Sequence, residues 1–373
     1  MKLTIERGAL LRSLGHVQSV VERRTTIPIL SNVQIQVDDN GLGLTATDLD
    51  LAVSETLPVE VVQAGATTAP AHTLYDIVRK LPDGAAVELA TGDDGQRLSL
   101  SAGRTRFSLA CLPIDDFPVM AEGEMPFQFT LSVDDIKQLV DKTRFAISTE
   151  ETRYYLNGIY LHIAEDGAAP TLRAVATDGH RLARFDLPVP QGAEGMPGII
   201  IPRKTVGELR KMVDEAEGSV AVALSQTKIR FSCDQLVLTS KLIDGTFPEY
   251  DRVIPSGNDK IVEIDSELLA EAVDRVSTIS TEKSRAVKLS INGPRLELSA
   301  NSPDQGTASD EMAITCEDGL ALDIGFNSRY LLDILSQIEG ERVIVTLADS
   351  ASPTLMRDAS DDRAIYVLMP MRV

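Results

Sequence analysis

The chain has 373 residues, 43% hydrophobic and 25% charged, which is enough for two or three globular domains with their own cores. Its formal net charge of −20 argues against a protein that grips nucleic acid through a broadly basic surface. No apolar run is long enough to span a membrane, and residues 1–5 lack the apolar segment of a signal peptide. Cys111, Cys233 and Cys316 have no metal-ligand or redox spacing, so we expect small buried hydrophobes in a reducing cytoplasm.

Three segments of the chain begin in the same way, and this internal repetition predicts the architecture. Each has a short alternating stretch followed by an amphipathic helical stretch. The alternating stretches are MKLTI (1–5), FQFTL (127–131) and KIVEI (260–264), and the helical ones are ALLRSL (9–14), DIKQLV (135–140) and LLAEAV (268–273). The triplet ATD at 46–48 recurs at 176–178, and FP at 117–118 recurs at 247–248.

A second helix is predicted midway through each repeat, at residues 72–81, 203–213 and 328–338. Alternating stretches follow these helices, for example at residues 97–100 and 105–109. Earlier in the first repeat, Gly41-Leu42-Gly43 is expected to form a hairpin turn. Turn-rich segments at 122–124 and 255–259 separate the repeats. The sequence therefore predicts an α+β protein with three tandem similar domains at residues 1–122, 126–252 and 258–373.

Several predicted helices carry basic residues opposite their apolar face. In the first helix Leu10, Leu14, Val17 and Val21 share one face. The opposite face holds Arg12, His16, Ser19 and Arg23, and the second helices hold Arg79, Lys80, Lys204 and Lys211. An ordinary solvated helix face explains the pattern equally well, and the acidic third repeat weakens it. In a chain of this charge, the pattern also suits a protein that surrounds DNA and holds it topologically.

The segment Asp178-Gly179-His180 is the one place that suggests a metal ligand or a general base. Neither His180 nor any other histidine has a second ligand at a suitable spacing, so a polar turn after a strand is the simpler interpretation. Asp48 and Asp178 stand at equivalent places in two repeats, which also indicates a structural turn. The chain contains neither a P-loop nor a dinucleotide-binding glycine motif.

Specific motifs resemble those of the bacterial DNA polymerase III beta subunit family, the DNA sliding clamps. They are RYYLNG (153–158), ATDGHRLA (176–183), TSKLIDG (239–245), FPEY (247–250), GFN (325–327) and YVLMPMRV (366–373), and the resemblance runs from Met1 to Val373. It implies three domains per chain and two chains paired head to tail as a homodimer ring. Helices would line the central hole, and sheets would form the outside.

The resemblance also implies a cleft that binds short linear peptides of partner proteins. Apolar, methionine and donor side chains suit that role. The residues carried over are Leu156, Thr177, Gly179, His180, Arg181, Leu182, Pro248, Arg252, Val253, Asn327, Tyr330, Val367, Met369, Pro370, Met371 and Arg372. The alternative is that residues 367–371 are simply the last core strand, and both interpretations can hold together. Ser284, Ala351 and Pro353 depart from the family pattern, so the rim of the cleft is expected to differ.

Other residues are carried over to the DNA channel and to the joint between chains. The expected DNA contacts are Arg24, Arg79, Lys80, Tyr154, Tyr155 and Lys204, although Tyr155 fits ordinary packing as well, and Glu150 stands where the family often has a polar donor. At the joint, Arg104, Arg106, Phe107 and Leu109 would meet the partner chain near Ile279 and the acidic residues Asp304, Asp310 and Glu311.

Taken together, these features predict a non-enzymatic ring that encircles double-stranded DNA and needs no cofactor and no metal. The expected partners are the polymerase III alpha subunit, the clamp loader, other polymerases and mismatch-repair proteins, with no membrane. Two rival hypotheses stay open from the residues alone. One is a hydrolase that uses Asp178 and His180, and the other is a peptide-binding scaffold with no DNA role.

Overall fold

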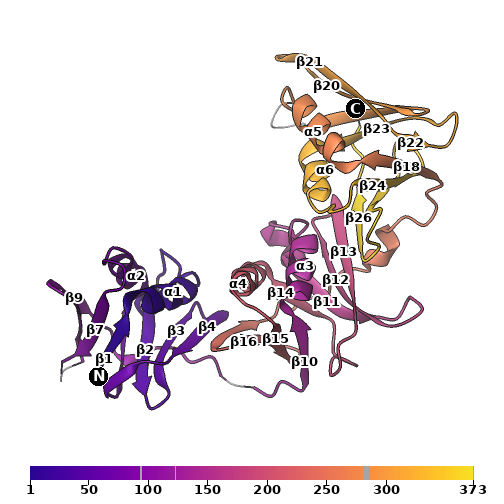
Figure 1. Cartoon of the computed structure of the whole chain (residues 1–373). Coiled ribbons are helices and arrows are strands. Elements are labelled where there is room, and N and C mark those ends of the chain that lie inside the picture. Colours follow the sequence, from indigo (N-terminus) through magenta and orange to yellow (C-terminus); the bar gives the residue numbers. More distant parts are fainter. Residues whose placement is uncertain (93–94, 122, 281–284, 373) are drawn as a thin grey trace. The chain divides into compact units, whose positions relative to one another are not determined.

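The structure is a computed structural model that describes residues 1–92, 95–121, 123–280 and 285–372 (Figure 1). Each repeat has a strand, a helix, further strands, a second helix and a closing run of strands. The first repeat contains β1 (Lys2–Glu6), α1 (Arg7–Gln18), η1 (Pro28–Ser31), β2 (Asn32–Asp38), β3 (Gly41–Thr47), β4 (Leu51–Leu57), β5 (Glu60–Gln63), β6 (Gly65–Pro70), α2 (Ala71–Arg79), β7 (Ala86–Thr91), β8 (Arg97–Ala102), β9 (Thr105–Ala110) and η2 (Ile114–Asp116).

The second and third repeats follow the same order. The second contains β10 (Phe127–Ser132), α3 (Val133–Arg144), η3 (Glu151–Leu156), β11 (Gly158–Ala164), β12 (Thr171–Thr177), β13 (Arg181–Pro188), β14 (Ile199–Pro202), α4 (Arg203–Asp214), β15 (Ser219–Leu224), β16 (Lys228–Cys233), β17 (Leu236–Lys241) and η4 (Tyr250–Val253). The third contains β18 (Lys260–Asp265), α5 (Ser266–Ser277), β19 (Ala286–Asn292), β20 (Arg295–Ser302), β21 (Gly306–Ala313), β22 (Thr315–Cys316), β23 (Ala321–Asn327), α6 (Ser328–Leu335), β24 (Arg342–Leu347), β25 (Thr354–Asp358) and β26 (Ala364–Leu368).

The predicted α+β class and the three tandem repeats are confirmed. The described chain packs into two compact units, because the second repeat contributes strands to both. The first unit is residues 1–136, 190–193 and 204–242, and the second is residues 137–189, 194–203 and 243–373. None of the described helices is both long enough and apolar enough to cross a membrane.

The first unit contains the joint between the first and second repeats. Its eight-stranded sheet has the order β10-β15-β16-β17-β4-β3-β2-β6, and a five-stranded sheet has the order β5-β1-β7-β8-β9. Antiparallel pairing of β17 with β4, from Leu236 opposite Glu55 to Ser240 opposite Leu51, carries the larger sheet across the joint. The joint is therefore held by backbone hydrogen bonds as well as by side chains.

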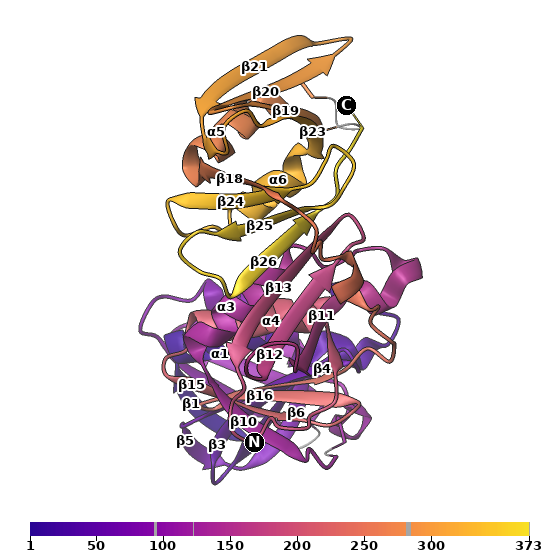
Figure 2. The same ribbon diagram turned by 90° about the vertical axis from the view of Figure 1, so that its right-hand side faces the viewer.

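The second unit contains the joint between the second and third repeats, and it uses the same device. The nine-stranded sheet β14-β11-β12-β13-β26-β25-β24-β18-β22 crosses the joint where β13 pairs with β26, with Arg181 opposite Leu368 (Figure 2). A four-stranded sheet, β21-β20-β19-β23, belongs to the third repeat alone. In both units the fourth strand of one repeat pairs with the last strand of the next.

The two ATD segments form the same polar turn in both units, as the sequence predicted. The Asp48 carboxylate accepts hydrogen bonds from the amides of Asp50 (3.0 Å) and Leu51 (2.7 Å). Asp178 does the same for His180 (2.9 Å) and Arg181 (3.0 Å). This is the Asx-turn geometry that short acidic side chains favour.

Several boundaries differ from the sequence predictions. Helix α1 ends at Gln18, so Arg23 lies beyond it, whereas Val21 is still buried. The second helices of the first and third repeats end earlier than expected, at Arg79 and Leu335. Gly41-Leu42-Gly43 begins strand β3, and the turn is formed by residues 39–40 because β2 pairs with β3 from Asp38 opposite Gly41.

The cysteines and His16 also depart from the sequence-based expectation. All three cysteines are free, but Cys111 and Cys316 are partly exposed, so only Cys233 behaves as a buried hydrophobe. His16 is not on a solvated helix face. Its Nδ1 lies 2.8 Å from Glu55 on β4, and its Nε2 lies 3.4 Å from Glu215, beyond α4. The hydrogen bond to Glu55 raises the pKa of His16 above its ordinary value, against the opposing effect of burial.

This raised pKa gives the first unit a pH-dependent stability. Protonated His16 stabilises the folded state, and the contribution is complete below the unfolded-state pKa of about 6.5 and is lost as pH rises through the higher folded-state pKa. We expect the free-energy difference between the wild type and His16→Gln, from urea unfolding, to shrink as pH increases above about 6.5. Glu55→Gln should remove the same dependence, and a difference constant with pH would contradict the assignment.

Candidate functional site

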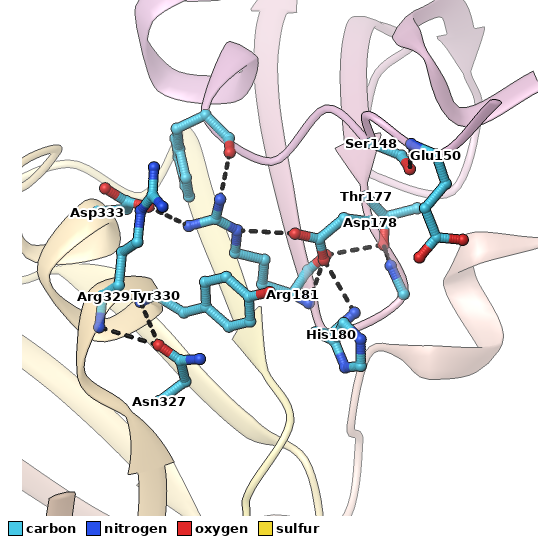
Figure 3. Close-up of polar contacts among 12 residues, drawn as sticks. Ser148, Glu150, Thr177, Asp178, His180, Arg181, Asn327, Arg329, Tyr330 and Asp333 are labelled. Atoms are coloured by element: carbon cyan, nitrogen blue, oxygen red, sulfur yellow. Dashed lines mark hydrogen bonds and ion pairs between the residues drawn. The ribbon is translucent and has the colours of Figure 1, made fainter. Parts of the chain in front are cut away.

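Arg181 is the central residue of the expected cleft, and it is buried in a network of its own chain (Figure 3). Its Nε donates to Asp178 at 3.1 Å, one terminal nitrogen donates to Asp333 on α6 at 2.5 Å, and the other donates to the carbonyl oxygen of Phe145 at 2.6 Å. The guanidinium also lies over the ring of Tyr330, 4.3 Å from its centroid. Arg181 therefore connects the residue that follows α3, the β12–β13 turn and α6.

That Arg181 also donates to a bound peptide stays a prediction, while the structure shows its guanidinium engaged by its own chain. Each of the three guanidinium nitrogens already donates to an oxygen of the chain, and the group also lies over two aromatic rings, 4.3 Å from the Tyr330 centroid and 5.2 Å from the Phe145 centroid. Donation from three nitrogens of one planar group to three different oxygens is a geometry that lysine cannot provide. Its role in the structure is to fix the positions of Tyr330 and of the turn that carries His180.

His180 and Met369 form the exposed part of the same region. The His180 ring stacks against Tyr330 at a centroid distance of 6.1 Å and is itself exposed. The Met369 amide donates to the His180 carbonyl oxygen at 2.9 Å, and 39% of the Met369 side chain is exposed. The exposed Met369 thus adjoins the His180 backbone, and the His180 ring adjoins the Tyr330 ring, so polarisable apolar groups and one polar ring gather in this region.

Residues 367–371 are only partly a core strand. Strand β26 ends at Leu368, and Val367 is buried, so this part belongs to the core. Beyond it the chain leaves the sheet, and the Met371 amide donates to the Gly325 carbonyl oxygen at 2.7 Å in an isolated bridge. Met369, Pro370, Met371 and Arg372 are partly or fully exposed.

The other expected cleft residues divide into a buried base, turn-forming residues and an exposed rim. Leu156, Leu182 and Val367 belong to one core cluster with Val175, Ile200, Phe247 and Tyr250. Thr177 and Asn327 act locally: Thr177 accepts the Gly179 amide (3.1 Å), and Asn327 accepts the Arg329 amide (3.0 Å) at the start of α6. The exposed rim consists of Gly179, Pro248, Val253 and Arg252, which pairs with Glu249.

Among the residues expected to contact DNA, Lys204 is the least available. Its ammonium group binds Asp48, the Val20 carbonyl oxygen (3.1 Å) and Glu22 (3.4 Å) within the first unit. The hydrogen bond and charge of Asp48 raise the pKa of Lys204, although burial opposes the shift. Because its charge is matched by two carboxylates, Lys204 contributes little free positive potential.

The remaining candidates for DNA contact are more exposed. Arg24 and Lys80 lie on the surface, and Arg79 is exposed but pairs with Asp76 at 3.1 Å. In the second unit, Tyr154 is 53% exposed, whereas Tyr155 packs against the core cluster, as its alternative interpretation predicted. Glu150 binds Arg153 at 2.7 Å, which satisfies the acid that departs from the family pattern.

The residues expected at the joint between chains lie on or near two edge strands, each in its own unit. β9 forms one edge of the five-stranded sheet and is exposed along its length except at half-buried Leu109, and the Phe107 side chain is 39% exposed. Arg104 and Arg106 are also exposed. β21 forms an edge of the four-stranded sheet and carries Asp310 and Glu311, which pair with Arg275 and Arg295 of the same chain. Ile279 is half-buried and Asp304 is exposed, and Ser284 lies outside the described residues.

Sequence reasoning missed the partners of Arg181 and His16. Arg181 and Asp333 are separated by 152 positions, and Lys142 and Glu339, which bind at 2.6 Å, by 197. Nothing in the local sequence marks such pairs. Alignment of the repeats gives one signal for these pairs: Lys142 stands at the same position of the first helix in its repeat as His16 does in the first repeat.

The hydrolase hypothesis receives no support from the site. Asp178 is engaged by two turn amides and by Arg181, and His180 is turned toward Tyr330. Across the part of the chain that the structure describes, there is no group of three or more histidine, cysteine or acidic side chains able to hold a metal ion. The arrangement suits the binding of an extended ligand.

Three tandem α+β domains joined through continuous sheets define the class of protein: a DNA clamp, a processivity factor with no catalytic site. Three family models match the chain in the same order. They describe the N-terminal, central and C-terminal domains of the DNA polymerase III beta subunit, and they match residues 1–121, 130–249 and 251–372. The chain belongs to the DNA polymerase III beta subunit family, the sliding clamps.

Full-length relatives agree with this assignment. The chain is 52% identical to the beta sliding clamp of Caulobacter vibrioides over 373 residues and 40% identical to that of Escherichia coli (strain K12) over 374, covering 100% of both chains each time. A Bartonella birtlesii sliding clamp solved in complex with griselimycin has a TM-score of 0.97 and 52% identity, again with complete coverage of both chains.

Removal of the Arg181 side chain should destabilise the second unit. Arg181→Ala leaves Asp178, Asp333 and the Phe145 carbonyl without their shared donor, and breaking a buried pair typically costs about 3–5 kcal/mol. Arg181→Lys should recover only part of this loss, because lysine lacks the planar fork. Urea unfolding measures the effect, with exposed His180→Ala as a control that changes stability by no more than about 0.5 kcal/mol. Equal losses for Arg181→Ala and His180→Ala would refute the role.

Proposed function

We propose that two copies of this chain pair head to tail into a closed ring that encircles duplex DNA and tethers a polymerase to its template. The observation that carries the proposal is the rule of the two joints: the fourth strand of one repeat pairs with the last strand of the next. The fourth strand of the third repeat is β21, and the last strand of the first repeat is β9. Both lie at sheet edges and have no partner strand from another repeat among the described residues. Pairing of these two strands between copies satisfies both edges.

The side chains of the two edge strands support this pairing. β9 offers Phe107, Leu109 and Arg106, with Arg104 in the turn before it, whereas β21 offers Asp310 and Glu311. Opposite charge at the two edges favours head-to-tail association over pairing of like edges. We place the domain boundaries at residues 1–122, 126–252 and 258–373, so that each domain holds one complete repeat, and we place the protein in the cytoplasm.

The second part of the proposal is that His180, Tyr330, Met369 and Met371, with the rim residues Pro248 and Val253, bind a short linear peptide. An exposed apolar surface over a rigid base provides anchor positions without a large conformational change. The partners we propose are the polymerase III alpha subunit, the clamp loader, other polymerases and mismatch-repair proteins. On DNA, Arg24, Arg79, Lys80 and Tyr154 are the proposed contacts, with Lys204 and Tyr155 in supporting positions.

Retention on DNA should be topological, because a net charge of −20 gives little electrostatic grip. We expect the assembled ring, loaded on nicked circular DNA, to remain bound when salt is raised and to be lost when the circle is cut. Gel filtration of labelled protein before and after linearisation measures this. Equal retention on circular and linear DNA would favour direct binding, and a peptide-binding scaffold with no DNA role would be retained on neither.

Deletion of residues 369–373 should abolish peptide binding while leaving the ring closed. The deletion removes Met369 and Met371 beyond the last strand, and loss of several apolar anchors costs about 2 kcal/mol or more each. Fluorescence anisotropy with a polymerase-derived peptide and light scattering on the same protein give the two readouts. Arg79→Ala, in the other unit, is the control for peptide binding. A truncated dimer that binds the peptide with unchanged affinity would place the binding surface elsewhere.

A further inference from the structure

Three residues occupy the same place in the first helix of each repeat. The caps define that place: the side chains of Glu6, Ser132 and Asp265 each accept the amide three residues later, at 2.9, 3.0 and 2.9 Å. Ten residues after the cap stand His16, Lys142 and Arg275. All three are basic, although the helices around them differ in charge.

In the two joints within the chain, this basic residue binds an acid of the following repeat. His16 of the first repeat lies 3.4 Å from Glu215 of the second. Lys142 of the second repeat lies 2.6 Å from Glu339 of the third. The acid stands in each case just beyond the second helix of its repeat, α4 or α6.

Arg275 has the first half of the same arrangement. His16 also binds Glu55 on β4, the fourth strand of its own repeat. Arg275 likewise binds Asp310 on β21, the fourth strand of its own repeat, at 2.9 Å, and Glu271 one turn away at 3.1 Å. Both of these acids belong to the third repeat, and in the part of the chain that the structure describes no acid of another repeat pairs with Arg275.

The first repeat holds an acid at the matching place. Backbone hydrogen bonds align the three segments, because Ala85, Gly218 and Glu341 accept the amides of Arg7, Val133 and Ser266 at 2.9, 3.0 and 3.0 Å. Glu339 stands two residues before the accepting residue Glu341, and Glu215 stands three residues before the accepting residue Gly218. Asp83 stands two before Ala85, and its side chain is 95% exposed even though one oxygen binds Arg7 at 2.6 Å.

We propose that Arg275 of one copy binds Asp83 of the second copy at each joint of the ring, completing the ion pair that His16 and Lys142 make within the chain. The proposal rests on the proposed head-to-tail ring and adds the contact between its helices. An arginine with several donors keeps Asp310 while binding a further carboxylate. The pair thereby links the β9–β21 joint to the helix layer and adds charge selectivity to it.

Charge reversal tests the pair. Arg275→Glu places two acids together at both joints, and Asp83→Arg places two arginines together, so each variant alone should dimerise at least tenfold more weakly, by sedimentation at falling concentration. A chain with both reversals should recover the lost affinity. Arg342→Glu is the matched control: it makes the same charge change in the third repeat, on β24, which pairs with β18 and β25, and it should dimerise like wild type.

Mixing the two single variants gives a sharper readout. A heterodimer of Arg275→Glu with Asp83→Arg has an opposite pair at both joints, so the mixture should associate more tightly than either variant alone. A misfolded variant cannot produce such rescue, and Arg275→Gln with Asp83→Asn serves as a milder pair if a reversal impairs folding. Single variants that match the Arg342→Glu control, or a mixture without rescue, would overturn the pair and leave the ring intact. A wild type that stays monomeric would overturn the ring.

Discussion

Backbone pairing between repeats is the interaction on which the rest of this molecule depends. β4 pairs with β17 and β13 pairs with β26, so two sheets cross the boundaries between sequence repeats. A continuous ladder leaves no free hydrogen-bonding edge at these boundaries, and it fixes the register in which helices and loops from different repeats meet. The Asx turns at Asp48 and Asp178 lie at these ladders, directly before β4 and β13. The surface around His180 is a product of one of these joints.

The turns at Asp48 and Asp178 have the same backbone structure but contact different side chains. Leu49 and Gly179 both have positive φ, at 80° and 89°, and the amides of both bind the preceding threonine hydroxyl. In the first unit Asp48 binds Lys204, which closes the turn against α4. In the second unit Asp178 binds Arg181, whose own side chain reaches Asp333 on α6. In both turns the residue two positions after the aspartate, Asp50 or His180, is exposed.

The strongly acidic composition is compatible with a role on DNA, because a clamp does not depend on a broadly basic surface. Several of its basic side chains are engaged by carboxylates of the chain, as for Lys204, Lys142 and Arg181. A ring retains DNA by closure, so strong electrostatic contacts are not needed, and weak contacts permit movement along the duplex. The ion pairs that Lys204, Lys142 and Arg181 make with Asp48, Glu339 and Asp333 each join residues of two different repeats.

The sequence by itself determined the number of repeats, their order of helices and strands, and the polar character of the ATD turns, because these depend on local periodicity and on side chains a few positions apart. It did not determine that Arg181 faces inward, that His16 lies between Glu55 and Glu215, or that the chain leaves the sheet after Leu368. These features depend on residues brought together from distant parts of the chain, as far as 199 positions for His16 and Glu215. Only the tertiary structure decided them, because a periodic pattern specifies which face of an element is buried but not which distant side chain will meet it there.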